Sequence, residues 1–330
     1  MTFAWAPGAS TGIGSLPGTD PAEAIRLVLG EQSTLPYLPE LPGRGLGADM
    51  IGRTAAVLVD LPVEYLPHGW TLASHPGHDL RRAKDHLERD LDLLTEHGAG
   101  LPLLKLALTG PLTLAASMEL PNLHKVLTDH GAVRDLAGSL AEGARRLVAQ
   151  VQQRLPDCQV VLQLDEPSLP AVLGGRVPTP SGYGTVRSLP ESVVSPLLTE
   201  VLSVVPEGAR VVHCCAPDVP YAVLRGAGFD AVSVDASLIR DAHLDAIGTF
   251  IDGGGSLWLG VVPGVDAVIT QASVRGFVRD LWGKLGFTSA QLATSVVLTP
   301  ACGLAGASEA YVRRTMSVLR DASKAILDEA

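Results

Sequence analysis

The sequence feature that most limits the possible folds is an alternation of short β-branched runs with longer helical patterns, beginning near residue 100. Each run is followed by a segment whose apolar residues recur every three or four positions. Repeated units of this kind predict parallel strands with helices packed outside the sheet. The expected strands lie within 101–110, 159–167, 209–215, 230–235, 256–262 and 295–302. The expected helices cover 131–155, 191–204, 218–226, 238–251, 271–285 and 309–328.

The number of such units predicts the architecture. About eight strands over a chain of 330 residues favour an α/β fold of the (β/α)8 TIM-barrel type, with a doubly wound sheet as the alternative. No GxGxxG or Walker-type loop follows an expected strand, which disfavours the nucleotide-binding doubly wound folds. No linker or charge block divides the sequence, so we expect a single catalytic TIM-barrel domain over residues 1–330.

The first hundred residues give weaker signals. Asp20, Pro21 and Glu23 together mark the start of a helix. Residues 79–98 form an amphipathic pattern that predicts a second helix. The segment 31–78 is rich in Gly and Pro, and we expect from it one strand and a long surface excursion.

Charge and cysteine content exclude several classes of function. The formal net charge of −10, scattered along the chain, argues against nucleic acid or an anionic membrane as partner, because both require a basic face. No uncharged apolar run reaches about 18 residues and no signal peptide is visible, so a cytoplasmic protein is expected. Four cysteines are too few for a disulfide scaffold, which favours metal binding or catalysis as their use.

Polar side chains follow four of the expected strands at the point where each strand ends. They are Asp165, His213 with Cys215, Asp235, and Cys302. In a barrel the carboxyl ends of the strands converge on one face, so residues far apart in sequence are expected to meet there.

Strand alternation divides the "HCC" sequence at 213–215. His213 and Cys215 lie two residues apart and point the same way, whereas Cys214 points toward the helix layer. Zinc accepts imidazole and thiolate ligands readily, so His213, Cys215 and Cys302 are predicted to bind Zn²⁺. Asp235 is the candidate for a fourth, displaceable ligand. Any one of these cysteines alone is more often a small buried apolar residue.

Six short motifs resemble, in the same order, the catalytic barrel of cobalamin-independent methionine synthases. They are "TGIGSLPGT" near the start, "LTGPLTL" at 108–114, "QLDEPSL" at 163–169, "HCC" at 213–215, "VSVDAS" at 232–237 and "PACGL" at 300–304. They span nearly the whole chain. The resemblance implies the short, single-barrel form of this family, with the uroporphyrinogen decarboxylase/methionine synthase type of fold.

The resemblance implies a zinc-dependent methyltransferase that moves a methyl group to the thiol of homocysteine and forms methionine. It carries the zinc-ligand role onto His213, Cys215, Asp235 and Cys302. It carries contacts with homocysteine onto Ile13, Gly14, Ser15 and Asp165. No catalytic residue is assigned beyond the zinc site.

The departures from the family's pattern lie mostly on the side of the methyl donor. The segment 259–266 holds no histidine where the family has a proton donor, and Ser117 and Ala171 stand where pterin contacts are expected. The ligand Asp235 replaces the family's usual Glu. These differences favour methylcobalamin or a corrinoid protein over methyltetrahydrofolate as donor. The family's second acidic contact to the amino acid is missing from 41–50, and we expect Arg44 or Asp49 to replace it.

The sequence leaves three other functions open. The same zinc site would also suit methylation of another small thiol, for which Arg44 would suit an anionic acceptor. A non-catalytic zinc- or corrinoid-binding module would bind the metal and methylate nothing. Decarboxylation of a porphyrin-like substrate, a further alternative, would require basic side chains around the site and would survive metal chelation.

Overall fold

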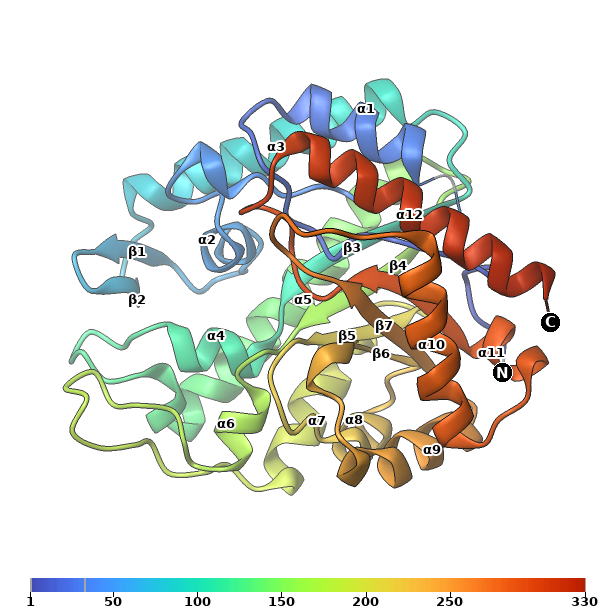
Figure 1. Cartoon of the computed structure of the whole chain (residues 1–330). Coiled ribbons are helices and arrows are strands. Elements are labelled where there is room, and N and C mark those ends of the chain that lie inside the picture. Colours follow the sequence, from blue (N-terminus) through green and yellow to red (C-terminus); the bar gives the residue numbers. More distant parts are fainter. Residues whose placement is uncertain (1, 33, 330) are drawn as a thin grey trace.

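The centre of the molecule is a curled parallel sheet of six strands (Figure 1). The structure is a computed structural model that describes residues 2–32 and 34–329. The strand order is β3-β4-β5-β6-β7-β8, so each strand pairs with the one that precedes it in the sequence. The strands are β3 (Leu103–Thr109), β4 (Gln159–Asp165), β5 (Arg210–Cys214), β6 (Ala231–Asp235), β7 (Ser256–Val262) and β8 (Val296–Pro300). All six predicted strands are confirmed.

The helices that connect these strands lie outside the sheet (Figure 1). They are α4 (Pro111–Ser117), α5 (His130–Arg154), α6 (Leu169–Leu173), α7 (Glu191–Leu202), α8 (Tyr221–Ala227), α9 (Leu244–Asp252), α10 (Gln271–Leu285), α11 (Ser289–Ser295) and, after β8, α12 (Glu309–Asp328). A single 3-10 turn, Val126–Thr128, precedes α5. The arrangement is the layered one that repeated βα units predict.

Two helix starts differ from the sequence prediction. The helix predicted at 238–251 begins only at Leu244, because the 3-10 turns Ala236–Leu238 and Asp241–His243 precede it. The helix predicted at 218–226 begins at Tyr221. Asp218 does not open it, since this residue has a φ of 62° and its carboxylate pairs with Arg240 at 2.6 Å.

The front part of the chain supplies an antiparallel hairpin and three helices. They are α1 (Pro21–Glu31), α2 (Met50–Ala55), β1 (Val63–Leu66), β2 (Gly69–Leu72) and α3 (His78–His97), with a 3-10 turn at Pro42–Arg44. The predicted cap of α1 is confirmed, because the Asp20 carboxylate accepts a hydrogen bond from the Ala22 amide at 2.9 Å. The segment 31–78 therefore holds a two-stranded hairpin, one short helix and a 3-10 turn, where we expected a single strand.

Two extended segments, 9–16 and 35–41, lie along the two edges of the six-stranded sheet. Ser10 forms a parallel bridge with Leu298 of β8, and Tyr37 forms one with Lys105 of β3. The two segments also bridge each other, with the Leu16 amide donating to the carbonyl of Glu40 at 2.9 Å.

These segments are isolated bridges, not regular strands, for a local reason. Pro36 and Pro39 have no amide hydrogen to donate, so a continuous ladder cannot form along 35–41. Close packing adds a second constraint: a Cβ at Gly12 would lie 2.4 Å from the ring of Tyr37. Only a glycine at position 12 lets the two segments approach this closely.

The strands are buried on both faces, but the two faces differ in chemistry. One face is aliphatic and packs against the helices, as expected for a parallel sheet. The other carries buried polar side chains at alternating positions, namely Lys105, Gln163, Asp165, His213, Ser233 and Thr299. Burying so many polar groups is unfavourable unless they pair with one another. This polar face is where the sequence predicted the site.

No helix within residues 2–32 and 34–329 is both long enough and apolar enough to cross a membrane. A cytoplasmic location stays a prediction.

The contact between α5 and residue 57 tests the packing outside the sheet. A Cβ at Gly143 would lie 2.0 Å from the carbonyl oxygen of Val57. We expect Gly143→Ala to destabilise the fold by about 1–3 kcal/mol, because backbone must move to admit the methyl group. Urea unfolding followed by circular dichroism measures the change.

The matched control is Gly138→Ala on the same helix, where the nearest atom to the added Cβ is a flexible carboxylate oxygen of Glu200 at 3.5 Å. This variant should gain up to about 1 kcal/mol from its higher helix propensity. Equal stability of the two variants would show that the Val57 carbonyl does not resist a methyl group at position 143.

Candidate metal and amino-acid site

Three predicted metal ligands meet at the carboxyl ends of β5 and β8. The side chains of His213, Cys215 and Cys302 place one ligand atom each within 4.8 Å of one another. The two sulfurs are 3.6 Å apart, although 87 residues separate them in the sequence. The structure therefore brings together His213 and Cys215, which strand alternation places on one face, and Cys302 from the end of another strand.

His213 is oriented by its neighbour on the next strand. β5 and β6 pair in the register His213 to Ser233, and the Ser233 hydroxyl lies 3.0 Å from Nδ1 of the imidazole. The other ring nitrogen, Nε2, is buried and has no hydrogen-bond partner. An unpaired buried nitrogen costs free energy unless something else binds it. Its position beside two thiols fits a metal ion, with Ser233 fixing which nitrogen faces the ion.

The two cysteines influence each other's protonation. The contact with Cys215, and then the nearby imidazole of His213, lower the pKa of the Cys302 thiol well below its usual range. The same contact with Cys302, together with burial, raises the pKa of Cys215. The two sulfurs lie within hydrogen-bond distance of each other, and a cation placed between them would take the place of their protons.

Cys214 lies on the other side of the strand, as alternation predicted. It is fully buried, and burial raises the pKa of its thiol to about 12. Its sulfur is not among the three clustered ligand atoms, because the side chain lies on the opposite face of the strand. Cys214 therefore packs in the helix layer and takes no part in the cluster.

Asp235 lies at the end of β6, outside the set of three ligand atoms. Its Oδ1 accepts hydrogen bonds from the Ser237 amide at 2.9 Å and from the Ser237 hydroxyl at 2.7 Å. It caps the 3-10 turn Ala236–Leu238. Its role as a fourth ligand stays a prediction, and would require the carboxylate to turn away from Ser237.

Asp165 lies at the end of β4 in a buried hydrogen-bonded network. The amide nitrogen of Gln163 donates to Asp165 at 2.7 Å and to the Ile13 carbonyl at 3.0 Å. The Lys105 ammonium donates to the Gln163 side-chain oxygen and to the Ile13 carbonyl, both at 2.6 Å. Burial raises the pKa of Asp165, and the nearby His213 opposes that rise. The carboxylate is thus close to both the metal cluster and segment 13–15.

The neighbouring carboxylate of the "DEP" sequence has a different task. Glu166 is fully buried and accepts hydrogen bonds from the Leu112 amide at 2.9 Å and the Thr113 amide at 2.8 Å. A Cβ at Gly110 would lie 2.2 Å from its Oε1. Glu166 therefore anchors the start of α4 over the end of β4, and leaves Asp165 facing the site.

Residues Ile13, Gly14 and Ser15 lie between the cysteine loop and a buried glutamate. The Leu304 amide donates to the Ser15 carbonyl at 2.8 Å, and a Cβ at Gly303 would lie 2.0 Å from the Ser15 hydroxyl. On the other side, a Cβ at Gly14 would lie 3.4 Å from the Glu40 carboxyl carbon. The predicted substrate segment is thus adjacent to the loop that bears a metal ligand.

Glu40 is the site residue that sequence reasoning missed. It ends the extended segment 35–41, is buried, and lies 3.7 Å from the Arg53 guanidinium. Burial raises its pKa to about 7, and Arg53 opposes the rise. The available signal was an acidic residue at the end of the Pro-rich run "LPYLPE", which would have placed it beside Gly14.

The predicted substitutes for an acidic contact were wrong. Arg44 makes two hydrogen bonds to Asp90 of α3, at 2.7 and 2.8 Å. Asp49 caps α2 by accepting from the Gly52 amide at 2.9 Å. Both side chains are thus occupied in local structure, whereas the buried carboxylate of Glu40 lies next to Gly14.

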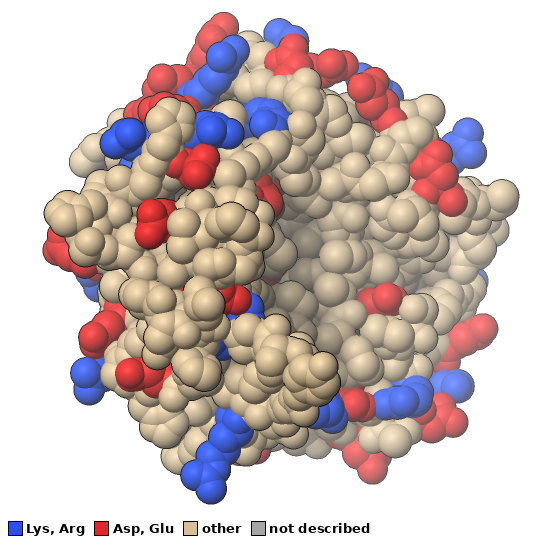
Figure 2. Space-filling model, turned by 90° about the vertical axis from the view of Figure 1, so that its left-hand side faces the viewer, with Lys and Arg blue, Asp and Glu red and all other residues tan. Residues whose placement is uncertain are grey.

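The face that carries these strand ends is hollowed at its centre. Figure 2 views the molecule from the left-hand side of Figure 1, where the β1–β2 hairpin, α4 and α6 lie, and shows mostly uncharged surface around the hollow with charged residues toward the margin. Of the positions expected to contact a donor, Ser117 ends α4 and Ala171 lies in α6.

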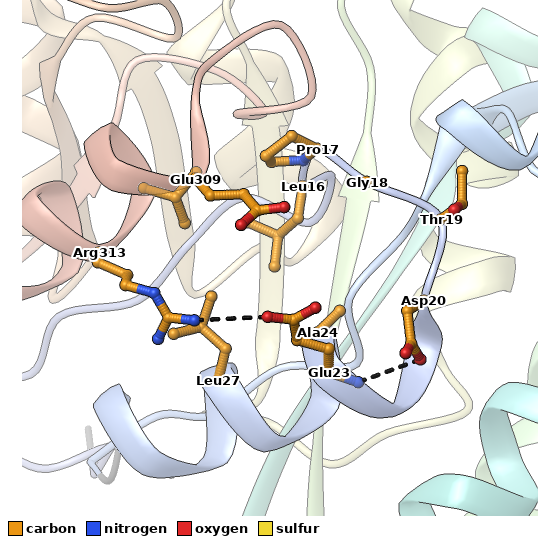
Figure 3. A pocket seen from close by; sticks show the side chains of 11 residues that line it. Leu16, Pro17, Gly18, Thr19, Asp20, Glu23, Ala24, Leu27, Glu309 and Arg313 are labelled. Atoms are coloured by element: carbon orange, nitrogen blue, oxygen red, sulfur yellow. Dashed lines mark hydrogen bonds and ion pairs between the residues drawn. The ribbon is translucent and has the colours of Figure 1, made fainter.

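A separate cavity of about 210 Å³ lies between α1 and α12 (Figure 3). Its charged side chains engage one another, since Arg313 lies 3.6 Å from Glu23 and the Asp20 carboxylate caps α1. None of the three clustered ligands lines it. We therefore place the functional site at the strand ends.

Comparison with known proteins gives one matching family and a number of similar solved structures, two of which are described below. A family model described as "Cobalamin-independent synthase, Catalytic domain" matches residues 100–325. The structure of a B12-independent methionine synthase from Shewanella sp. W3-18-1, in complex with selenomethionine, aligns over 98% of this chain and 99% of that chain, with a TM-score of 0.64 and 14% identity. A β-methylaspartase from Clostridium tetanomorphum aligns over 98% of this chain and 60% of that one, with a TM-score of 0.45 and 11% identity. No protein among those with curated descriptions matches.

The orientation of His213 by Ser233 can be tested through metal affinity. We expect Ser233→Ala to weaken Zn²⁺ binding by about tenfold, because the imidazole loses the hydrogen bond that directs Nε2 toward the sulfurs. Competition with a chromophoric chelator measures the affinity. The control is Ser256→Ala. Ser256 is a buried serine at the start of β7, away from the carboxyl ends of the strands, and its hydroxyl donates to the Ser295 carbonyl. Equal affinities in both variants would contradict the assigned role.

Proposed function

We propose that this chain transfers a methyl group to homocysteine at a zinc ion held by His213, Cys215 and Cys302. The chain belongs to the cobalamin-independent methionine synthase family and is a methyltransferase that methylates homocysteine. The observation that carries this proposal is the convergence of one imidazole nitrogen and two sulfurs within 4.8 Å. A nitrogen and two thiolates form a donor set that suits Zn²⁺ and leaves a position for a further ligand.

The ion would supply the charge that converts a bound thiol into a thiolate nucleophile. A free aliphatic thiol has a pKa of about 8.5 and is mostly protonated at neutral pH. The protein's own contribution is to hold the ligands: Ser233 orients His213, and the sulfurs of Cys215 and Cys302 lie 3.6 Å apart. Asp235 is the proposed fourth ligand, which would give way to the substrate.

We assign the amino-acid end of homocysteine to the region between Asp165 and Glu40. Two buried carboxylates next to each other suit an ammonium group, since each otherwise lacks a full counter-charge. The backbone of Ile13, Gly14 and Ser15 lies between them and the Cys302 loop. An amino acid bound there would direct its short side chain toward the metal cluster.

Methyltetrahydrofolate is the proposed methyl donor. The family match does not support the methylcobalamin or corrinoid donor that the sequence departures suggested. In the transfer, the carbon–sulfur bond forms as the carbon–nitrogen bond of the donor breaks, the thiol proton leaves to solvent, and the departing nitrogen takes up a proton. With no histidine in 259–266, we assign that last proton to water.

We also propose that segments 9–16 and 35–41 complete the sheet as a (β/α)8 barrel forming one domain over 1–330. The bridges from Ser10 to Leu298, from Ser15 to Glu40 and from Tyr37 to Lys105 support this closure. A closed barrel leaves no bare sheet edge, and it gathers all the strand ends around a single opening.

Replacing one sulfur tests the metal site directly. Cys302→Ser should lose most of the bound zinc and reduce methionine formation by at least about 100-fold, because a hydroxyl is a much weaker zinc ligand than a thiolate. Metal analysis of the purified protein and an assay of methionine measure the two effects. Cys158→Ser, which changes a buried cysteine outside the cluster, is the control. Full zinc content in Cys302→Ser would refute the proposed site.

The donor and the acceptor are separated by a panel of substrates. We expect methionine from homocysteine and methyltetrahydrofolate, little product from methylcobalamin, and none when a small anionic thiol such as coenzyme M replaces homocysteine. The physical reason is that two buried carboxylates bind an ammonium group and repel a sulfonate. Zinc binding without methylation of any thiol would instead identify a non-catalytic module.

A further inference from the structure

A chain of buried charges runs from helix α3 to the substrate region. Asp90 of α3 pairs with the Arg44 guanidinium at 2.7 Å and with Arg53 of α2, also at 2.7 Å. Arg53 in turn lies 3.7 Å from Glu40. The side chains of Arg44, Arg53 and Asp90 are each less than a tenth exposed. Arg53 is therefore the one member that connects the outer ion pair to the site.

Glu40 needs such a partner. A buried carboxylate is strongly disfavoured in its charged form without a nearby positive charge. Around it, Arg53 of α2 and Lys105 of β3 favour the ionised form, whereas Asp165 of β4 and Asp90 of α3 oppose it. Lys105 already donates to Ile13 and Gln163. Among the neighbouring charges, Arg53 therefore does most to lower the pKa of Glu40 against the rise caused by burial.

The position of Arg53 is fixed from two sides. Helix α2 is attached to the end of β3, because the Thr109 amide donates to the Thr54 hydroxyl at 2.8 Å and the Thr109 hydroxyl donates to the Met50 carbonyl at 2.8 Å. Asp90 holds the far end of the guanidinium. The side chain therefore directs its Nε at Glu40 before a ligand binds, and binding costs no further conformational entropy of Arg53.

We propose that Arg53 is a positioning residue, which acts through Glu40 by keeping that carboxylate ionised and directed at the ammonium group of the amino-acid substrate. Asp90 and Arg44 hold Arg53 in place. The inference rests on the proposed function, because it takes Glu40 as a contact of the amino acid. The inference adds to that function a role for Arg53 of α2, held by Asp90 of α3, in setting the pH range in which the amino acid binds.

The direction of the pH effect follows from the sign of the charges. Glu40 binds an ammonium group only when ionised, and its pKa is about 7, so affinity should fall as the pH drops through that value. Removing Arg53 takes away a positive charge and raises the pKa of Glu40 further, by about one unit for a partner at this distance. Near pH 7 the ionised fraction, and with it the affinity, should then fall about fivefold.

The experiment measures methionine binding to the metal-free full-length protein by isothermal titration calorimetry, from about pH 5.5 to 8.5. Methionine has no titrating thiol, and omitting metal and donor keeps the measurement independent of turnover. Arg53→Gln should move the midpoint of the pH dependence upward by about one unit. Arg53→Lys, which keeps the charge, should restore most of the wild-type midpoint. Glu40→Gln should bind weakly with little dependence on pH in this range.

Arg44→Gln is the matched control. It removes a cation from the same Asp90 carboxylate but leaves the pair between Arg53 and Glu40. It should lower thermal stability without moving the midpoint, whereas a purely structural role for Arg53 would give both arginine variants the same behaviour.

Two outcomes overturn the inference in different ways. A wild-type midpoint retained in Arg53→Gln, with methionine still bound, removes the role of Arg53 and leaves the proposed function intact. Absence of methionine binding to the wild type at every pH removes the proposed substrate and the inference with it.

Discussion

The parallel register of β4, β5 and β6 is the constraint on which the site depends. It sets Asp165 beside His213 and His213 beside Ser233 at the carboxyl ends of adjacent strands. Because side chains alternate along a strand, a slip of one residue would turn His213 and Cys215 toward the helices and bring Cys214 into the site. The aliphatic residues between them oppose such a slip, since it would expose them to the polar face.

The polar face of the sheet is tolerated because most of its groups form hydrogen bonds with one another, although the buried hydroxyl of Thr299 has no partner among the described residues. Lys105, Gln163, Asp165 and the Ile13 carbonyl form a continuous set of hydrogen bonds. A buried lysine is costly, and burial lowers its pKa to about 8 even with Asp165 and Glu40 nearby. A network with all members paired is rigid, which keeps the substrate segment 13–15 at a fixed distance from the cysteine loop.

Two buried polar groups near the site are not fully paired. Nε2 of His213 is buried without a partner, and the carboxylate of Glu40 has only a single ion pair at 3.7 Å. One group lies among thiols and the other beside Gly14 and Asp165. The imidazole nitrogen has the chemistry to hold a metal ion that would bind a thiol, and the carboxylate has the chemistry to bind an ammonium group. Unpaired capacity at these two points is what a site for a thiol amino acid would retain.

How much the sequence predicts differs between the fold and the site. The six strands, the cap at Asp20 and the pairing of His213 with Cys215 depend on local periodicity, which a single sequence contains. Pro36 and Pro39 interrupt the strand pattern of segment 35–41, and the places of 9–16 and 35–41 follow from pairing with β8 and β3, which lie far away in the sequence.

The sequence by itself determined which residues share a face of a strand, because alternation is a property of the extended backbone. Only the tertiary structure decided that Glu40 and not Arg44 or Asp49 lies in the site, and that Asp235 turns toward Ser237. The physical reason is that ion pairs and side-chain rotamers depend on partners brought close by folding. Asp90, which holds both Arg44 and Arg53, lies on a helix tens of residues away in the sequence.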